Sequence, residues 1–459
     1  MTEIDWYTRR NDRQRRYAGR VLPADRPIVI SLDPSYGARF DGQVAAIVAV
    51  NLLARMTPSL VLDVPHIQIV SPLPWAGAVL SDFMLRVARG ADPYGVFTTR
   101  LPTRGDYVLS FGRGDASAAV HGSGWYAFVG SGHSPIPDAD VPNPIGPSFA
   151  AVAAAARLFA RELAPIDGPF LFDAFNWRNA INGSSPPLAV ESDLGKIWTV
   201  GAGSVGTAAL YFLALATRRF SALVIDMDKV KVENLDRSPI FTSDDAAQDL
   251  YKADVTASYL RAVGVIDAAA ECTPLDASLR WSKRTEGMPD LIISAANERN
   301  VRYVIERSCP PLQIYGTTGA NWVASVIRHI PFVDGCSCCI FPHDLSRPAM
   351  ACAEAQIEDA QSGEQIDASL PFLSFAAGLM AAAEVLKAGL CSYPFSAGRT
   401  TFCTGPMVLP RFVSSTPPRR PGCICGDRSE SVHRRMIAGT RYAHLSSIPI
   451  HMTSAEHQV

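Results

Sequence analysis

The sequence has no excess of charge of either sign and no long uncharged apolar run. Its 42 lysine and arginine residues are balanced by 44 aspartate and glutamate residues, so nothing favours nucleic acid or an anionic membrane as a partner. The N-terminus is charged from its start and lacks the apolar centre of a signal peptide. The most apolar stretch, 370–390, contains Glu384 and Lys387 and predicts a packed helix, because a membrane span would be longer and uncharged. These absences predict a cytoplasmic protein without a nucleic-acid or membrane partner.

The sequence also lacks the histidine patterns of catalytic metal sites, because no H-x-E or H-E-x-x-H arrangement occurs. Ten cysteines are present, several of them in tight clusters. In a chain of 459 residues without a signal peptide, such clusters indicate a metal site or a reactive thiol in a reducing compartment rather than a disulfide framework.

Strand-like and helix-like runs alternate along both halves of the chain, which favours parallel α/β sheets. In the first half, the expected strands are 27–32, 59–64, 107–111 and 125–129, and the expected helices are 43–55, 75–89 and 148–163. Turn-forming residues cluster in "INGSSPPLAVESD", which is the best linker candidate. The segment after Ser429 has no sustained period, and we expect a loosely attached tail. The chain is therefore divided into an arginine-rich segment 1–26, a first α/β domain 27–180, a linker 181–194, a second α/β domain 195–428 and a tail 429–459.

The second domain begins with a nucleotide-binding pattern. A strand-like run leads into Gly201, Gly203 and Gly206 in G-x-G-x-x-G spacing, and a helix-forming run follows. The first glycine permits a tight turn, the second lets the main chain approach a phosphate, and the third packs the helix on the strand. Asp226 ends the next strand and is placed to hold ribose hydroxyls. The pattern suits NAD as well as ATP, and a glycine-rich turn without a ligand is the alternative.

Polar residues beyond the second strand favour ATP over NAD. Asn234 and Arg237 lie three residues apart, and Lys252 follows. A triphosphate attacked at its α-phosphate needs cations there, because charge builds on the phosphoryl oxygens and on the departing pyrophosphate. Each residue taken alone also fits a solvated surface group.

Several stretches now carry a family resemblance. In order they are "VGAGSVG", "VIDMDKVKVENLDR", "YKAD", "DLIISAANERNVRYVIERSC", "GTTGANW", "GCSCCIFP", "LPFLSFAAGLMAAAEVLK" and "GCICG". Together they cover roughly 195–427 and are similar to the active adenylation domain of the ubiquitin-activating (E1-like) and ThiF–MoeB adenylyltransferase family. The resemblance implies that the C-terminal glycine carboxylate of a ubiquitin-like protein attacks the α-phosphate of MgATP. The products would be an acyl adenylate and pyrophosphate.

The resemblance also implies roles for individual residues. Asp226 would hold the ribose, and the three polar residues beyond it would contact the phosphates. Where the family usually has an aspartate that helps to hold magnesium, this sequence has Asn297, whose neutral carbonyl oxygen is a poorer ligand for a hard cation. Glu298 or Asp228 would have to compensate; otherwise adenylation is slow or lost.

The N-terminal stretch "NDRQRRYAG" resembles the D-R-Q-x-R-x-x-G segment that precedes the inactive half of the eukaryotic enzymes. In those enzymes the arginine reaches across a pseudo-twofold axis into the ATP site of the active half. Arg13 is the candidate for this role and Arg16 the second candidate, with a plain arginine-rich tail as the alternative. The resemblance thus implies two Rossmann-like adenylation domains, one degenerate and one active, that form a pseudo-dimer within one chain.

Two cysteine pairs predict a structural zinc site. Cys336 and Cys339 are spaced C-x-x-C, and Cys423 and Cys425 are spaced C-x-C. Four thiolates in two close pairs are typical of structural Zn²⁺. The second pair of the family is normally also C-x-x-C, so the one-residue deletion and the spare Cys338 leave the ligand set open.

Cys352 stands apart in "RPAMACAEAQIEDAQSGEQ", a polar stretch that suggests an exposed loop. A thiolate there could attack the adenylate and form a thioester. Relatives carry their reactive cysteine in this loop, and an inert cysteine is the alternative.

We therefore expect a bacterial, ATP-dependent activating enzyme for a ubiquitin-like protein, with ATP, Mg²⁺ and Zn²⁺ as its cofactors. A thioester would pass the ubiquitin-like protein to a conjugating enzyme, and the resemblance extends to pathways of antiviral defence. Two other functions stay open. One is an adenylyltransferase for a sulfur-carrier protein, and the other is a non-catalytic scaffold that binds a ubiquitin-like protein or nucleotide, which Asn297 favours. An NAD oxidoreductase is a more distant alternative.

Overall fold

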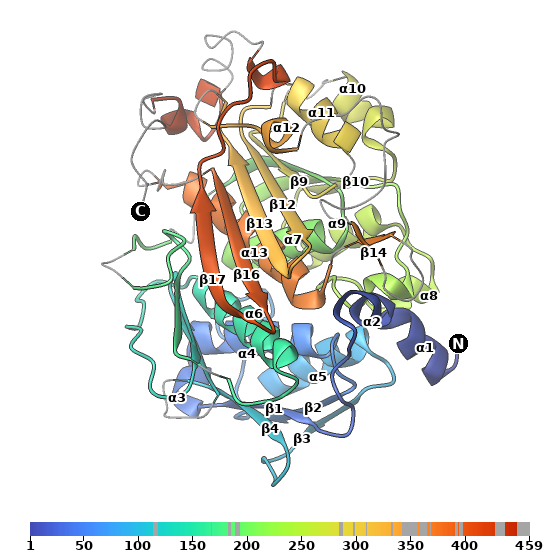
Figure 1. Cartoon of the computed structure of the whole chain (residues 1–459), viewed down its shortest axis with the longest axis vertical. Coiled ribbons are helices and arrows are strands. Elements are labelled where there is room, and N and C mark those ends of the chain that lie inside the picture. The colour runs from blue at the N-terminus through green and yellow to red at the C-terminus, as the bar shows by residue number, and fades with distance from the viewer. Residues whose placement is uncertain are drawn as a thin grey trace.

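The chain is described by a computed structural model that contains two α/β halves (Figure 1). The residues that the structure describes are 1–112, 118–166, 168–181, 185–188, 193–283, 288–296, 299–308, 310–331, 334–341, 356–358, 365–367, 369–390, 393, 398–426 and 437–447.

The first half forms a seven-stranded sheet of order β3-β2-β1-β4-β5-β6-β7. The first five of these strands are parallel, and β6 and β7 are antiparallel additions. Its strands are β1 (Ile28–Leu32), β2 (Ser59–Asp63), β3 (Val96–Thr99), β4 (Tyr107–Phe111), β5 (Ala119–Ser123), β6 (Tyr126–Gly130) and β7 (Phe170–Asp173). Its helices are α3 (Pro34–Gly37), α4 (Phe40–Leu53), α5 (Leu80–Ala91) and α6 (Ile145–Ala160).

The second half forms an eight-stranded sheet of order β10-β9-β8-β11-β12-β13-β16-β17, again with five parallel strands followed by antiparallel ones. Its strands are β8 (Gly195–Val200), β9 (Phe220–Ile225), β10 (Ala268–Glu271), β11 (Leu291–Ser294), β12 (Gln313–Gly319), β13 (Val323–His329), β16 (Arg399–Gly405) and β17 (Val408–Ser415). Its helices are α7 (Ser204–Ala216), α8 (Ser243–Ala247), α9 (Lys252–Ala262), α10 (Leu279–Lys283), α11 (Arg299–Arg307), α12 (Ser337–Ile340) and α13 (Pro371–Ala388). Short elements complete it: the turns η1 (Val232–Asn234), η2 (Leu275–Ala277), η3 (Ile424–Gly426) and η4 (Ala443–Ser447), and the pair β14 (Gln356–Glu358) and β15 (Gln365–Asp367).

The four strands expected in the first half are present, and the sheet is mostly parallel, as the alternation predicts; only its β6–β7 end is antiparallel. A tight turn at Gly124 and Trp125 joins β5 to β6, and such a short turn can connect only antiparallel strands. Alternating apolar runs indicate whether a segment is a strand or a helix, but they do not indicate the direction in which a strand runs. The structure also contains the short strands β3, β5 and β7, which the sequence pattern does not predict.

Helices from both halves pack between the two sheets (Figure 1). Helix α13 contacts α7 of its own half and α6 and α4 of the first half, and one apolar cluster includes residues of all four. Among the described helices, α13 alone is long and apolar enough to cross a membrane, yet all of its residues are buried in the protein. Its two charges form an ion pair of 2.6 Å, Lys387 to Glu384, and Trp177 of the first half donates a hydrogen bond to Glu384. The prediction of a packed helix is confirmed.

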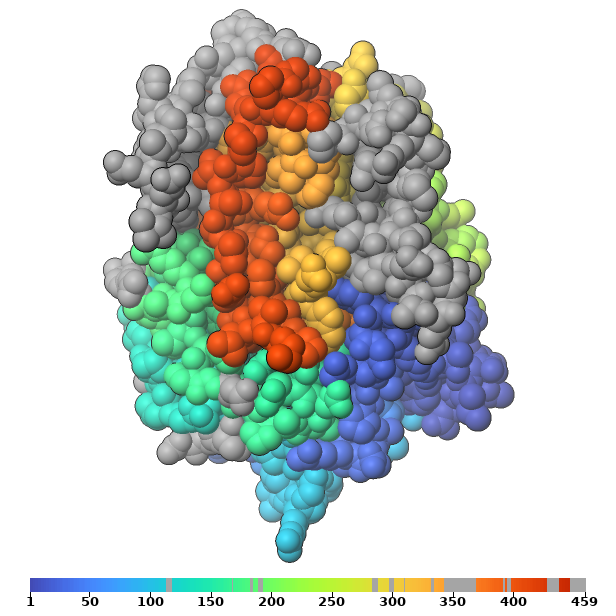
Figure 2. Space-filling model, viewed as in Figure 1, coloured from blue at the N-terminus to red at the C-terminus, as the bar shows by residue number. Residues whose placement is uncertain are grey.

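The arginine-rich N-terminus forms two helices, α1 (Glu3–Arg10) and α2 (Asp12–Ala18). Thr2 begins α1 with a capping box that it shares with Asp5, a signal present in the sequence. The helices lie at the junction of the two halves and are blue in Figure 2. The Tyr17 hydroxyl donates to the carbonyl of Gly319 and accepts from the amide of Trp322, each at 2.9 Å. This contact fixes the segment on the β12–β13 turn of the second half.

The expectation of a loosely attached tail is wrong for residues 437–447. Tyr442 is 1% exposed, and its hydroxyl donates to the carbonyl of Leu194 at 3.0 Å. Arg441 pairs with Asp193 beside it. A single tyrosine and its apolar neighbours therefore dock this segment at the start of β8, although the stretch shows no helical or strand period.

Candidate functional site

The glycine motif forms the turn between β8 and α7. Gly201 has a φ of +92°, and a Cβ there would lie 2.7 Å from the amide nitrogen of Ala296. A Cβ at Gly206 would lie 2.0 Å from the carbonyl oxygen of Gly201, so helix and turn need glycine at both places. A Cβ at Gly203, by contrast, meets nothing within 4 Å. Gly203 begins α7 without a side-chain cap, which leaves the first N–H groups of the helix for a ligand.

Asp226 lies directly after β9 and touches the glycine turn. Its carboxylate accepts hydrogen bonds from the amide of Ala202 at 2.6 Å and from the amide of Asp228 at 2.8 Å. Burial raises the pKa of Asp226, and the positive charge of Lys252 opposes that shift. Lys252, the first residue of α9, donates from Nζ to Asp228 Oδ2 at 2.7 Å. The carboxylate is thus fixed in place, with a cation close to it.

These residues line a cavity of about 310 Å³ at the carboxyl ends of β8, β9 and β11. This is the place where ligands bind in open α/β sheets. Its polar part is supplied by Gly201, Gly203, Asp226, Asp228, Lys252, Thr273 and Asp276. Its remaining wall is mostly apolar and includes Met227, Pro274, Leu275, Val301 and Val304. An apolar wall opposite a few convergent polar groups is the composition of a small-molecule site.

A second cavity, of about 910 Å³, brings together Arg13 of α2 with Asn234 and Arg237 of the second half. Arg237 is 7% exposed and donates to the carbonyl of Glu233 at 2.6 Å and to Asp236 Oδ1 at 2.5 Å. Asn234 Oδ1 accepts from a backbone amide of its own turn at 3.0 Å. Burial raises the pKa of Asp236, and the positive charges of Arg237 and Arg13 oppose that shift. Arg13 therefore lies close to the Asp236–Arg237 pair.

The structure separates the two N-terminal arginine candidates. Arg13 lines the second cavity, whereas Arg16 pairs with Asp12 on its own helix at 3.7 Å and lines neither of the two cavities. Arg9 of α1 also reaches the second cavity and forms an ion pair of 2.8 Å with Glu233.

Sequence reasoning does not single out Arg9, Glu233 or Asp236. Glu233 and Asp236 belong to the same "VENLDR" stretch as Asn234 and Arg237, so the sequence alone indicates that these residues lie close together. The sequence does not indicate that they pair with the N-terminal helices, because that pairing depends on tertiary contacts. Of the other predicted site residues, Asn297 and Cys352 lie outside the described residues, as does Glu298.

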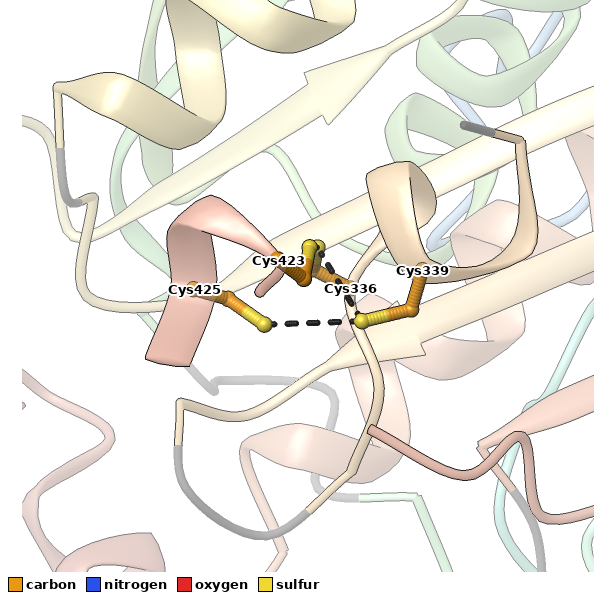
Figure 3. Close-up of side chains that lie close together, drawn as sticks. All are labelled: Cys336, Cys339, Cys423 and Cys425. Carbon is orange, nitrogen blue, oxygen red and sulfur yellow. Dashed lines mark hydrogen bonds between the residues drawn. The ribbon is translucent and has the colours of Figure 1, made fainter. Parts of the chain in front are cut away.

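The two cysteine pairs form one cluster (Figure 3). Cys336 and Cys339 lie at the start of α12, and Cys423 and Cys425 lie at η3. The Sγ–Sγ distances are 3.8 Å for Cys336–Cys339 and 3.5 Å for both Cys336–Cys423 and Cys339–Cys425, and all four sulfurs lie within 4.8 Å of one another. Four thiolates at about 2.3 Å from a tetrahedral Zn²⁺ would be separated by about 3.8 Å. The cluster therefore fits a zinc ion, and Cys338 is buried beside it but is not one of the four.

Comparison with known proteins agrees with the geometry. Residues 193–421 match the model of the ThiF family. The chain belongs to the ThiF family.

Two relatives are also similar to this chain. Protein y4jF of Sinorhizobium fredii is 23% identical over 366 residues, which are 75% of this chain and 66% of y4jF, so the chain spans just under two thirds of that relative. The sulfur carrier protein adenylyltransferase of Thermus thermophilus is 26% identical over 249 residues, which are 52% of this chain and 84% of the relative. Among solved structures, E. coli MccB is similar at 16% identity with a TM-score of 0.41, covering 68% of this chain and 96% of MccB. MccB in complex with MccA gives 19% identity and a TM-score of 0.39, over 51% of this chain and 67% of MccB. The ThiF-family match thus covers the second half of the chain, and one relative is named as an adenylyltransferase.

Proposed function

We propose that this ThiF-family protein transfers AMP from ATP to the C-terminal carboxylate of a small protein. The observation that carries the proposal is the meeting of Arg13 with Asn234 and Arg237 in one cavity. The stretch of chain that bears Asn234 and Arg237 leads directly back to Asp226 and Asp228 in the cavity beside the glycine turn. A nucleoside with a chain of phosphates needs this combination of a ribose acceptor, free helix amides and several cations.

Each residue has a defined task in the proposed reaction. Asp226, fixed by two amide donors, would accept a ribose hydroxyl, and the N–H groups after Gly203 would bind phosphate oxygens. A carboxylate oxygen of the partner attacks the α-phosphorus, the bond from that phosphorus to the bridging oxygen breaks, and pyrophosphate leaves. Lys252, Arg237 and Arg13 would offset the negative charge that develops on the phosphoryl oxygens and the leaving group.

The two halves, in this proposal, form a pseudo-dimer within one chain. Their sheets share the order third, second, first, fourth and fifth strand, and helices of both pack at the common core. The first half would contribute Arg13 through its N-terminal helices, and the second half would hold the nucleotide. The four-cysteine cluster would bind a structural Zn²⁺.

A ubiquitin-like protein ending in glycine is the partner that we propose, with a thioester at Cys352 and transfer to a conjugating enzyme. The support is the resemblance of the sequence motifs to ubiquitin-activating enzymes. A sulfur-carrier protein is the second candidate, favoured by the Thermus thermophilus relative, whose name states that function. The two differ in whether a covalent, thiol-sensitive adduct forms on the enzyme.

The experiment that tests the proposal is ATP–pyrophosphate exchange in the presence of small candidate proteins that end in glycine. Wild type should catalyse exchange, and Arg13→Ala should lower the rate by about 10³-fold because it removes a cation from the phosphate end. Arg16→Ala is the matched control on the same helix and should exchange within about twofold of wild type. Exchange that is unaffected by Arg13→Ala would contradict the proposed site. ATP binding without exchange for any partner would make the scaffold function the better account.

A further inference from the structure

The end of α4, in the first half, is buried against residues 235–241 of the second half. Arg55, just past the end of α4, is 2% exposed. Its Nη1 donates to the carbonyl of Leu235 at 2.6 Å, and its Nη2 donates to the carbonyls of Pro239 and Phe241 at 3.2 and 3.1 Å. One guanidinium thus binds three backbone oxygens of the segment 235–241, which follows Asn234 and contains Arg237.

Asn51, one turn earlier on α4, completes this contact. Its Oδ1 accepts from Arg55 Nε at 3.0 Å, and its Nδ2 donates to the carbonyl of Pro239 at 3.0 Å. The guanidinium is therefore held in one orientation by its own helix. The planar fork of arginine suits several fixed acceptors at once, which a lysine ammonium cannot match.

The same turn of α4 also contacts α1 and α2, and α2 carries Arg13. Arg10 Nη1 donates to the carbonyl of Ala54 at 3.3 Å, and Gln14 Nε2 donates to the carbonyl of Arg55 at 3.4 Å. Arg10 and Gln14 flank Arg13 in the chain. The end of α4 is thus in contact with both segments that meet in the second cavity.

We propose that Arg55 is a positioning residue that fixes the segment 235–241, and with it Asn234 and Arg237, opposite Arg13. The expected effect of Arg55 on nucleotide binding rests on the proposed function. Its expected effect on the order of the segment 235–241 does not. Arg55 lines neither of the two cavities described above, so it acts through the residues that it holds.

The test compares wild type with Arg55→Lys, which keeps the charge but loses the fork. Asn51→Ala is the milder second variant, since it only loosens the orientation of Arg55. Arg157→Lys is the matched control, because Arg157 is also buried, at 3% exposed, on α6 of the same helical layer. Two quantities are measured: backbone amide exchange of residues 232–241, and the affinity for ATP by calorimetry.

Arg55→Lys should raise the exchange rates of the Arg237 and Ser238 amides and weaken ATP binding by about 10- to 100-fold, because several hydrogen bonds from a charged donor are lost. Asn51→Ala should change both in the same direction by less, and Arg157→Lys should change neither. Unaltered amide exchange in folded Arg55→Lys and Asn51→Ala would overturn the positioning role. Faster exchange with unaltered ATP affinity would overturn its link to the nucleotide. If wild type binds ATP but never supports pyrophosphate exchange, the proposed function fails, while these two readouts still decide the role of Arg55.

Discussion

The two halves of the chain use the same strand order but treat the end of their first strand differently. After β1, Asp33 caps α3: its Oδ1 accepts from the amides of Ser35 and Tyr36 at 2.9 and 3.1 Å, and Pro34 takes the first helical position. After β8, Gly203 begins α7 with no side-chain cap. In the first half the protein's own carboxylate thus binds the first amides of the short helix that follows β1. In the second half no side chain caps the helix that follows β8.

The ends of the second strands repeat the contrast. Asp63 closes β2, and Asp226 follows β9, so both halves present a carboxylate at this edge of the sheet. Asp63 accepts from the hydroxyl of Ser31 at 2.7 Å, whereas Asp226 accepts from the amide of Ala202 in the glycine turn. The comparison teaches that two halves with the same strand order can differ in the groups they present to a ligand through a few side chains at one sheet edge.

The largest expected effect comes from making the second half resemble the first. Gly203→Asp should fold, since a Cβ there meets nothing within 4 Å and the backbone φ is −73°. The new carboxylate should cap α7 and occupy the phosphate position, so ATP affinity should fall at least about 100-fold while the helix gains only about 0.3 kcal/mol. Calorimetric titration with ATP and thermal unfolding would measure the two effects. Gly203→Asn is the uncharged control and should weaken ATP binding less; equal losses would show that charge is not the cause.

The next effect concerns the cysteine cluster, a feature of the second half. Cys336→Ser should lose bound zinc and lower the free energy of unfolding by about 3 kcal/mol or more, because one of four metal ligands is removed. Cys338→Ser changes a buried neighbour outside the four and should retain the metal. Zinc per chain by elemental mass spectrometry, together with thermal unfolding, decides the matter. Loss of zinc in both variants, or in neither, would contradict the assigned ligand set.

The smallest expected effect lies in the first half. Asp33→Ala should cost about 1 kcal/mol at pH 7 through the lost cap and should leave ATP binding unchanged. The hydrogen bond from the Ser35 hydroxyl lowers the pKa of Asp33 below its usual value. A lowered folded-state pKa stabilises the fold above the unfolded-state value, and this contribution is lost as the pH falls through the folded-state value. The stability difference between variant and wild type should therefore shrink in acid. A stability difference that does not change with pH would contradict the role of the Asp33 carboxylate as the cap.

Much of the second half could be predicted from local patterns. The glycine spacing, Asp226 and the cysteine pairs are short-range signals. The structure brings Gly201, Gly203 and Asp226 to one cavity and gathers the four cysteines in one cluster. The first-half strands that contain Val29 and Val61 are equally predictable, because each is an apolar run rich in β-branched residues.

The rest depends on contacts between segments far apart in the chain. Nothing local to Arg55 shows that it binds the carbonyl of Leu235, and nothing local to Tyr442 shows that it docks on Leu194. The antiparallel direction of β6 likewise follows from a turn of two residues and not from its own composition. Local pattern therefore identifies the groups that could act, and tertiary packing decides which of them meet.

The central claim is that each chain holds one nucleotide site, in its second half. The stoichiometry of ATP binding to the purified wild-type protein tests it most directly. The account predicts one ATP per chain by equilibrium titration, abolished by Gly203→Asp and retained in Asp33→Ala. Two ATP molecules per chain, or one that persists in Gly203→Asp, would contradict it.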